Sequence, residues 1–196
     1  ELIWQGKQKE AETLALEKFM SVPIRQKAYQ PFGDVWLTFP GHEQASDYYR
    51  ELNISSAICI TSYKVVETTF KREYFASYPD NIIAINLSAD KKRSLTFDVS
   101  MTADHESFTA KAGGNGTIEL NFRVKDGVLS GSSLLKVILK GGNISVKGSN
   151  LHIEKANKAI LLIVAATSFV NPKDVSGNPG KRCNEYLTAL TNKKYG

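Results

Sequence analysis

The chain has 196 residues and a formal net charge of +5, and it is 42% hydrophobic and 23% charged. This composition is typical of a globular protein and excludes disordered, collagenous and fibrous classes. The longest apolar runs, such as residues 160–166, are far shorter than the roughly 20 residues of a membrane-spanning helix, so we expect no membrane insertion.

The charge pattern and the cysteines argue against two kinds of site. Lysines and arginines are scattered among acidic residues and form no stripe interleaved with aromatics, so we do not expect nucleic-acid binding. Cys59 and Cys183 lie far apart, and neither has a histidine nearby. Zinc needs clustered cysteine and histidine ligands, so we expect no metal and no cofactor, and we interpret both thiols as small buried side chains.

The first twenty residues carry a helical pattern. Ala11, Leu14, Ala15 and Phe19 recur at helical spacing with charged residues between them, and Pro23 marks the expected end of the helix. We therefore assign residues 1–23 to an N-terminal helical segment.

The middle of the chain has the period of β-strands. Val35 and Leu37 begin an alternation, and from about residue 48 to residue 166 the pattern is almost wholly β. Asp126-Gly127 predicts a two-residue hairpin turn. Residues 159–166 are almost continuously apolar, which indicates a central strand covered on both faces. About ten short segments separated by turn signals predict an antiparallel β-sandwich over residues 24–169.

The last segment, residues 170–196, is predicted to be a loop followed by a helix. Its loop contains Asn171, Pro172, Asn178 and Pro179. The apolar positions of the helix share one face: Cys183, Tyr186, Leu187 and Leu190.

Catalytic carboxylates are the first chemistry to consider. A glycosidase needs two carboxyl groups about 5 Å apart for retention, or roughly 6.5–9.5 Å apart for inversion. The candidates by residue type are Asp34, Glu51, Glu67, Glu73 and Asp80. Nothing in their spacing forces two of them to face each other, so we interpret them as residues of strand surfaces and turns. We assign no catalytic residue.

Aromatic side chains offer a second kind of site. Trp36 alternates with apolar neighbours on its predicted strand, and Tyr48 and Tyr49 precede another. These three are candidates for binding carbohydrate by stacking against sugar rings. The alternative is that they pack against a neighbouring domain, because large apolar side chains usually end up in cores and interfaces.

Several segments resemble glycoside hydrolase family 95, whose members are α-L-fucosidases and some α-L-galactosidases. The segments that carry the resemblance follow in order: GKQKEAETLALEKFM, YQPFGDVWLTF, YYRELNISSAICITSY, FKREYFASYPDNIIAINLSAD, LLIVAATSFVNPKD and CNEYLTALTNKKY. The resemblance covers essentially the whole chain. It is most specific at residues 29–39 and 72–80.

The resemblance implies an N-terminal β-sandwich domain of the super-sandwich type, leading into a helical linker. In that family the catalytic centre lies in a following (α/α)6 barrel, which we expect to be this domain's partner. No catalytic residue carries over, so the chain alone is predicted to be inactive. We also expect that the chain starts downstream of the first strands and ends within the linker helix.

Three further expectations follow from the resemblance. The ligands are expected to be fucosylated glycans, and the location periplasmic or secreted. An open sheet edge left by missing strands is expected to favour self-association. The alternative function is a free-standing carbohydrate-binding or adhesion β-sandwich, supported by the aromatics and the β pattern.

Overall fold

The structure is a computed structural model that describes residues 1–22, 24, 29–125 and 127–190. It divides into two compact units, residues 1–31 and residues 32–196. Three predicted features lie outside the described residues: Pro23 at the end of the first helix, Asp126 of the hairpin turn, and residues 191–196 of the linker.

The first unit contains α1 (Gln8–Lys18), which lies within the predicted helical segment. Its N-cap, Lys7, makes no capping hydrogen bond through its side chain, and no residue of α1 is buried. An isolated helix shorter than about 12–15 residues is marginally stable in water. The 11 residues of α1 therefore gain little stability from packing within their own unit.

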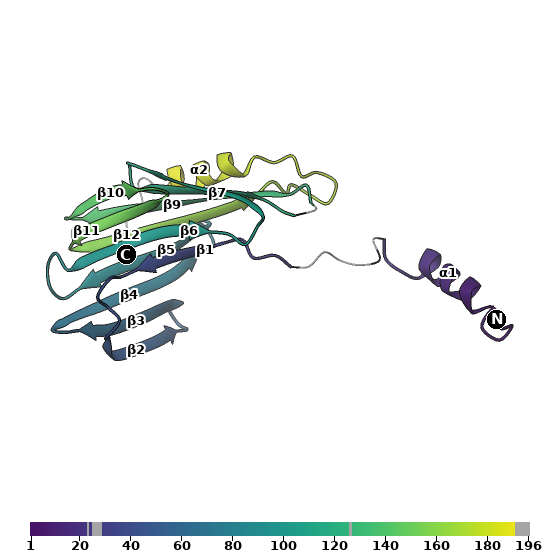
Figure 1. Cartoon of the computed structure of the whole chain (residues 1–196), viewed down its shortest axis with the longest axis horizontal. Helices are drawn as coiled ribbons and strands as arrows, with labels where there is room; N and C mark the ends of the chain where they lie inside the picture. The colour runs from purple at the N-terminus through teal and green to yellow at the C-terminus, as the bar shows by residue number, and fades with distance from the viewer. Residues whose placement is uncertain (23, 25–28, 126, 191–196) are drawn as a thin grey trace. The chain divides into compact units, whose positions relative to one another are not determined.

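The second unit confirms the predicted antiparallel β-sandwich (Figure 1). The small sheet has the strand order β1 (Asp34–Thr38), β6 (Leu95–Thr102), β11 (Asn150–Ala156) and β10 (Asn143–Lys147). The large sheet has the order β2 (Ser46–Asn53), β3 (Ile58–Val65), β4 (Thr68–Ser77), β5 (Ile82–Ala89), β12 (Lys158–Thr167), β9 (Ser130–Lys140), β8 (Thr117–Arg123) and β7 (Ser107–Gly113). Every pairing is antiparallel.

The main core lies between the two sheets. Alternate residues of β6 point into it, and Phe97 and Val99 are completely buried there. The inner faces of β12 and β8 contribute Leu161 and Leu120 to the same cluster. Successive side chains of a strand point to opposite faces, so the alternation in the sequence places one apolar set in this core.

Strand β12 is central, as its apolar run predicts. It pairs with β5 on one side and with β9 on the other. Leu161 faces the core between the sheets, whereas Val164 belongs to a second apolar cluster on the outer face of the large sheet. Both faces of the strand are therefore covered.

Helix α2 (Pro179–Ala189) covers that second cluster. The side chain of Asn178 caps the helix by accepting a hydrogen bond from the backbone N–H of Lys181 at 2.9 Å. Cys183 is fully buried against β9, and its Sγ lies 3.2 Å from the carbonyl oxygen of Ser132. The predicted final helix is therefore anchored on β9 and β12, as Figure 1 shows in yellow over green.

The hairpin turn predicted at Asp126-Gly127 lies partly outside the described residues, and the register of β8 against β9, with Arg123 opposite Ser130, is the one that it predicts. Strand β8 ends at Arg123 and β9 begins at Ser130. The backbone N–H of Gly127 bonds to the carbonyl of Val124 at 3.2 Å, and Val124 N–H bonds to the carbonyl of Leu129 at 3.0 Å.

Replacing Phe97 tests where the core lies. Its ring is completely buried and stacks on Phe39 with the ring centroids 4.9 Å apart. We expect Phe97→Ala to lower the free energy of unfolding by about 3–5 kcal/mol, because it leaves a cavity. The exposed control Val128→Ala should change it by less than about 0.5 kcal/mol. Urea unfolding measures both, and equal effects would contradict this placement of the core.

Candidate functional site

A groove lies where the large sheet extends past the small one. The close contacts of the small sheet are with β5, β7 and β8. On the inner face of the remaining strands, burial decreases toward the edge: Phe70 of β4 is 5% exposed, Tyr63 of β3 is 6% exposed, and Tyr48 of β2 is 65% exposed. The inner face of the large sheet therefore becomes accessible to solvent toward its β2 edge.

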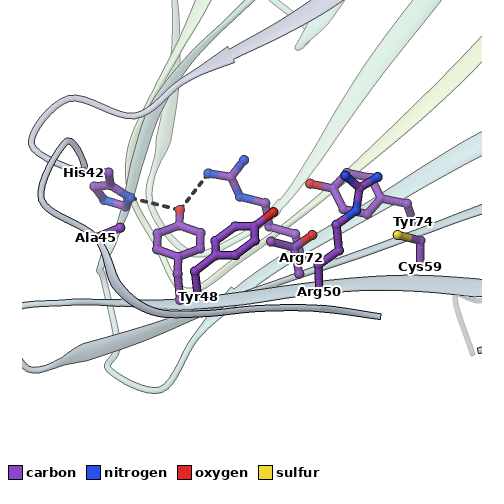
Figure 2. A pocket seen from close by; sticks show the side chains of 9 residues that line it. His42, Ala45, Tyr48, Arg50, Cys59, Arg72 and Tyr74 are labelled. Carbon is purple, nitrogen blue, oxygen red and sulfur yellow. Dashed lines mark hydrogen bonds between the residues drawn. The ribbon is translucent and has the colours of Figure 1, made fainter. Parts of the chain in front are cut away.

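The groove has a volume of about 570 Å³, within the range of about 300–1,000 Å³ that is usual for small-ligand sites. Its lining residues come from β2, β3, β4 and the loop between β1 and β2: His42, Ala45, Tyr48, Arg50, Cys59, Thr61, Tyr63, Arg72 and Tyr74. Figure 2 shows His42 and Ala45 at one end of the groove, and Arg50 and Cys59 at the other.

A hydrogen-bonded chain organises one end. Arg72 Nη2 donates to the Tyr63 hydroxyl at 2.7 Å, and that hydroxyl lies 3.0 Å from His42 Nδ1 (Figure 2). Burial and the positive charge of Arg72 lower the pKa of His42, although Glu43 acts in the opposite direction. The imidazole is therefore neutral near pH 7, and in the tautomer with its proton on Nε2, Nδ1 accepts a hydrogen bond from the Tyr63 hydroxyl.

Arg72 is held firmly but has no anionic partner among the described residues. Its guanidinium lies 4.3 Å from the ring centroid of Phe39 and 5.0 Å from that of Tyr63. Its Nε is buried and has no hydrogen-bond acceptor within the described part of the chain. Of the salt bridges in this part of the chain, none includes Arg72.

The opposite end of the groove carries a second cation. Arg50 lies on the edge strand β2, and the nearby sulfur of Cys59 raises the pKa of its guanidinium. None of the nine lining residues is acidic. Positive charge within a concave surface raises the local concentration of anions, so the groove is suited to a negatively charged group.

A bulge places Tyr48 in the groove. The register of β2 against β3 shifts between Ser46 and Tyr49, and Asp47 has a φ of 50°. Aspartate tolerates this left-handed conformation better than most residues, and bulges commonly redirect a side chain. Tyr48 therefore lines the groove, whereas Tyr49 lies on the opposite face of the sheet. There the Tyr49 hydroxyl donates a hydrogen bond to the carboxylate of Glu51.

The structure does not bring the three predicted carbohydrate-binding residues together. Trp36 is 57% exposed on the outer face of the small sheet, where its indole N–H donates to Thr102 Oγ1 at 2.9 Å. Tyr48 lies in the groove, and Tyr49 lies on the outer face of the large sheet. Carbohydrate binding by each of them stays a prediction.

Two of the carboxylate candidates lie in one row that runs across β2, β3 and β4, on the same face of the large sheet. Glu51 and Glu73 both pair with Ile60, from opposite sides, so two strand spacings or roughly 9.6 Å separate their backbones. Glu73 accepts hydrogen bonds from Lys71 at 2.8 Å and from Asn86 at 2.5 Å. The Lys71 bond is the main cause of the lowered pKa of Glu73. A general acid needs a raised pKa, so Glu73 is not suited to that role.

The other carboxylate candidates are residues of strand ends and turns. Asp80 accepts a hydrogen bond from Ser77 at 2.7 Å, and Glu67 pairs with Lys64 at 3.7 Å. Asp34 is the first residue of β1.

The described residues contain neither a cluster of metal ligands nor a membrane-spanning helix. Among the described residues, no three histidine, cysteine or acidic side chains are arranged to hold a metal ion. No helix in the same part of the chain is long and apolar enough to cross a membrane.

Sequence reasoning missed most of the groove. The alternation over residues 68–75 places Phe70, Arg72 and Tyr74 on one strand face. The signal available in the sequence was this arginine, which lies between two aromatic residues on a strand face that otherwise continues the core. The sequence does not indicate that this face lies beyond the small sheet, because strand order depends on long-range pairing.

Comparison with known families gives one extended match. Residues 1–172 match the family model described as "Glycosyl hydrolase family 65, N-terminal domain". The match covers both the first unit and nearly all of the sandwich.

Two individual proteins are similar to the chain. It is 31% identical over 198 residues to "Alpha-L-fucosidase 2" of Arabidopsis thaliana, an alignment that covers 85% of this chain and 23% of that protein. The chain thus spans about a quarter of the length of this curated relative. A solved structure titled "Putative kojibiose phosphorylase from human microbiome" aligns with a TM-score of 0.48 and 13% identity, over 75% of this chain and 22% of that one.

Proposed function

The chain belongs to the family of N-terminal domains of glycosyl hydrolase family 65, and from that premise we propose that it serves an α-L-fucosidase of the family 95 type as a noncatalytic domain. The match to an N-terminal domain family over residues 1–172 is the observation that carries this proposal. The 31% identity to a protein named α-L-fucosidase supports the choice of fucosidase.

The role that we propose is to support a helical catalytic domain in the same polypeptide. Two features of the chain favour this role. Helix α2 is anchored on the large sheet through Cys183, so it could hold a following domain against the sandwich. The pKa of Glu73 is lowered, mainly by its hydrogen bond from Lys71, whereas a general acid needs a raised pKa, and this is consistent with chemistry located elsewhere.

The natural substrates of the complete enzyme would be fucosylated glycans. Such glycans lie outside the cytoplasm, so we propose a periplasmic or secreted location. Both points rest on the resemblance of the chain to fucosidases.

An immunoblot and an activity assay test the proposal together. An antibody against this chain should detect, in periplasmic or secreted fractions of the source cells, a band several times heavier than 21.7 kDa. The immunoprecipitate should hydrolyse 4-nitrophenyl α-L-fucoside, and the isolated chain should not, because it contributes no acid and base pair.

Two results would contradict the proposal. A native band of 21.7 kDa alone would favour a free-standing domain. Hydrolysis of the fucoside by the isolated chain, abolished by Glu73→Gln, would place the chemistry in the sandwich.

A free-standing carbohydrate-binding or adhesion sandwich is the second candidate. The observation that favours it is Trp36, whose large ring is 57% exposed on the small sheet. Ser100 pairs with Trp36 on the neighbouring strand, and the Thr102 hydroxyl accepts a hydrogen bond from the indole N–H. An exposed aromatic ring among hydroxyl groups suits the flat face of a sugar.

Fluorescence titration tests this second candidate. Trp4 is the other tryptophan, so the titration should use a Trp4→Phe background. A fucosylated oligosaccharide that stacks on Trp36 should change its emission saturably with a Kd near or below about 1 mM. Trp36→Ala should abolish binding measured by calorimetry, with the exposed Tyr78→Ala as the control. No heat and no change in emission at several times that concentration would reject binding at Trp36.

We also propose self-association through the unpaired edge of β2. This strand ends the large sheet and is mostly exposed. Unpaired strand edges are templates for pairing with another chain. Sedimentation equilibrium should show an average mass that rises above 21.7 kDa with concentration. A constant mass of one chain at every concentration would contradict this proposal.

A further inference from the structure

We propose that the groove on the inner face of β2–β4 binds a saccharide that carries a carboxylate group. Carboxylate groups of the ligand would bind Arg72 at one end of the groove and Arg50 at the other, and the rings of Tyr48 and Tyr74 would pack against the sugar. This site is independent of the proposed support of a catalytic domain, and it lies away from Trp36.

Charge is the first argument for this ligand. The lining contains two guanidinium groups and no carboxylate. Arg72 is positioned by Tyr63 at 2.7 Å and by the ring of Phe39, so little conformational entropy would be lost when it binds an anion. Arginine presents a planar fork of N–H donors that matches the two oxygens of a carboxylate.

The shape and chemistry of the lining favour a saccharide over a peptide. An extended peptide usually binds to the open edge of a sheet, where it pairs with free backbone groups. The groove instead lies on a sheet face, where the backbones of β3 and β4 are already paired on both sides. It therefore offers only side chains, namely tyrosine rings, hydroxyl groups and guanidinium groups. A sugar ring with hydroxyl and carboxylate substituents is complementary to that set.

Cys59 provides a local probe of the groove. It lines the groove next to Arg50 and forms no disulfide. The second thiol, Cys183, is fully buried, and desolvation raises its pKa to about 11. A thiol reagent at about pH 8 should therefore modify Cys59 first, since the thiolate is the reactive form.

The binding experiment compares charged and neutral forms of the same sugars. Calorimetry of the full chain with galacturonic and glucuronic acid trisaccharides should give saturable binding that weakens as salt increases. The methyl esters of the same trisaccharides should bind at least about tenfold more weakly, because they lack the charge. A saturating acidic trisaccharide should slow the labelling of Cys59 at least about fivefold, since it covers the sulfur.

Matched variants assign the binding to the groove. Arg50→Gln and Tyr48→Ala change exposed side chains on an edge strand, so both should fold normally and weaken binding about tenfold or more. Arg123→Gln makes the same charge change on β8, outside the groove, and Tyr78→Ala removes an exposed aromatic ring that does not line the groove. Both controls should leave Kd within about twofold.

Four outcomes would overturn the proposal. The first is no binding of either acidic trisaccharide at about 10 mM, ten times the Kd of a weak millimolar site. The second is equal affinity for the methyl esters. The third is equal weakening by Arg50→Gln and Arg123→Gln, which would indicate diffuse attraction to the net positive charge. The fourth is binding with unchanged Cys59 labelling, which would place the ligand elsewhere.

Discussion

The large sheet has eight strands and the small sheet has four, and this difference determines where the core ends and where the groove begins. Under the small sheet, inward side chains are apolar and almost fully buried, as Phe97 and Leu161 illustrate. Beyond the small sheet, the inner face of the large sheet carries Arg72 and Tyr74, both on β4. The side chains on the inner face of the large sheet therefore change from apolar to polar and charged where the small sheet no longer covers that face.

Helix α2 has the corresponding role on the outer face. It covers the apolar cluster that includes Leu134 and Val164, and its cap at Asn178 fixes where the helix starts. The two faces of the large sheet are thus closed by different elements, the small sheet on one side and α2 on the other. This arrangement leaves the strands from β2 to β4 as the part of the sandwich most available to a ligand or a neighbouring domain.

Much of the fold could be predicted from the sequence because the signals are local. The alternation of β6 and the apolar run of β12 correctly indicate half-buried and central strands, and the pattern of Cys183 and Leu187 indicates the face of the last helix. The groove could not be predicted, because Arg50 and Arg72 become neighbours only through the pairing of three strands. Likewise, the separation of Trp36 from Tyr48 depends on which sheet each strand joins.

Hydrogen exchange of the whole chain, with and without a glucuronic acid trisaccharide, tests this account most directly. The account predicts that amides of β12 and β9 exchange most slowly and those of β2 most rapidly. It also predicts that the trisaccharide slows exchange in β2 and β3 while leaving β1 and β6 unchanged. Uniform exchange across the large sheet, or slowing centred on β1 around Trp36, would contradict it.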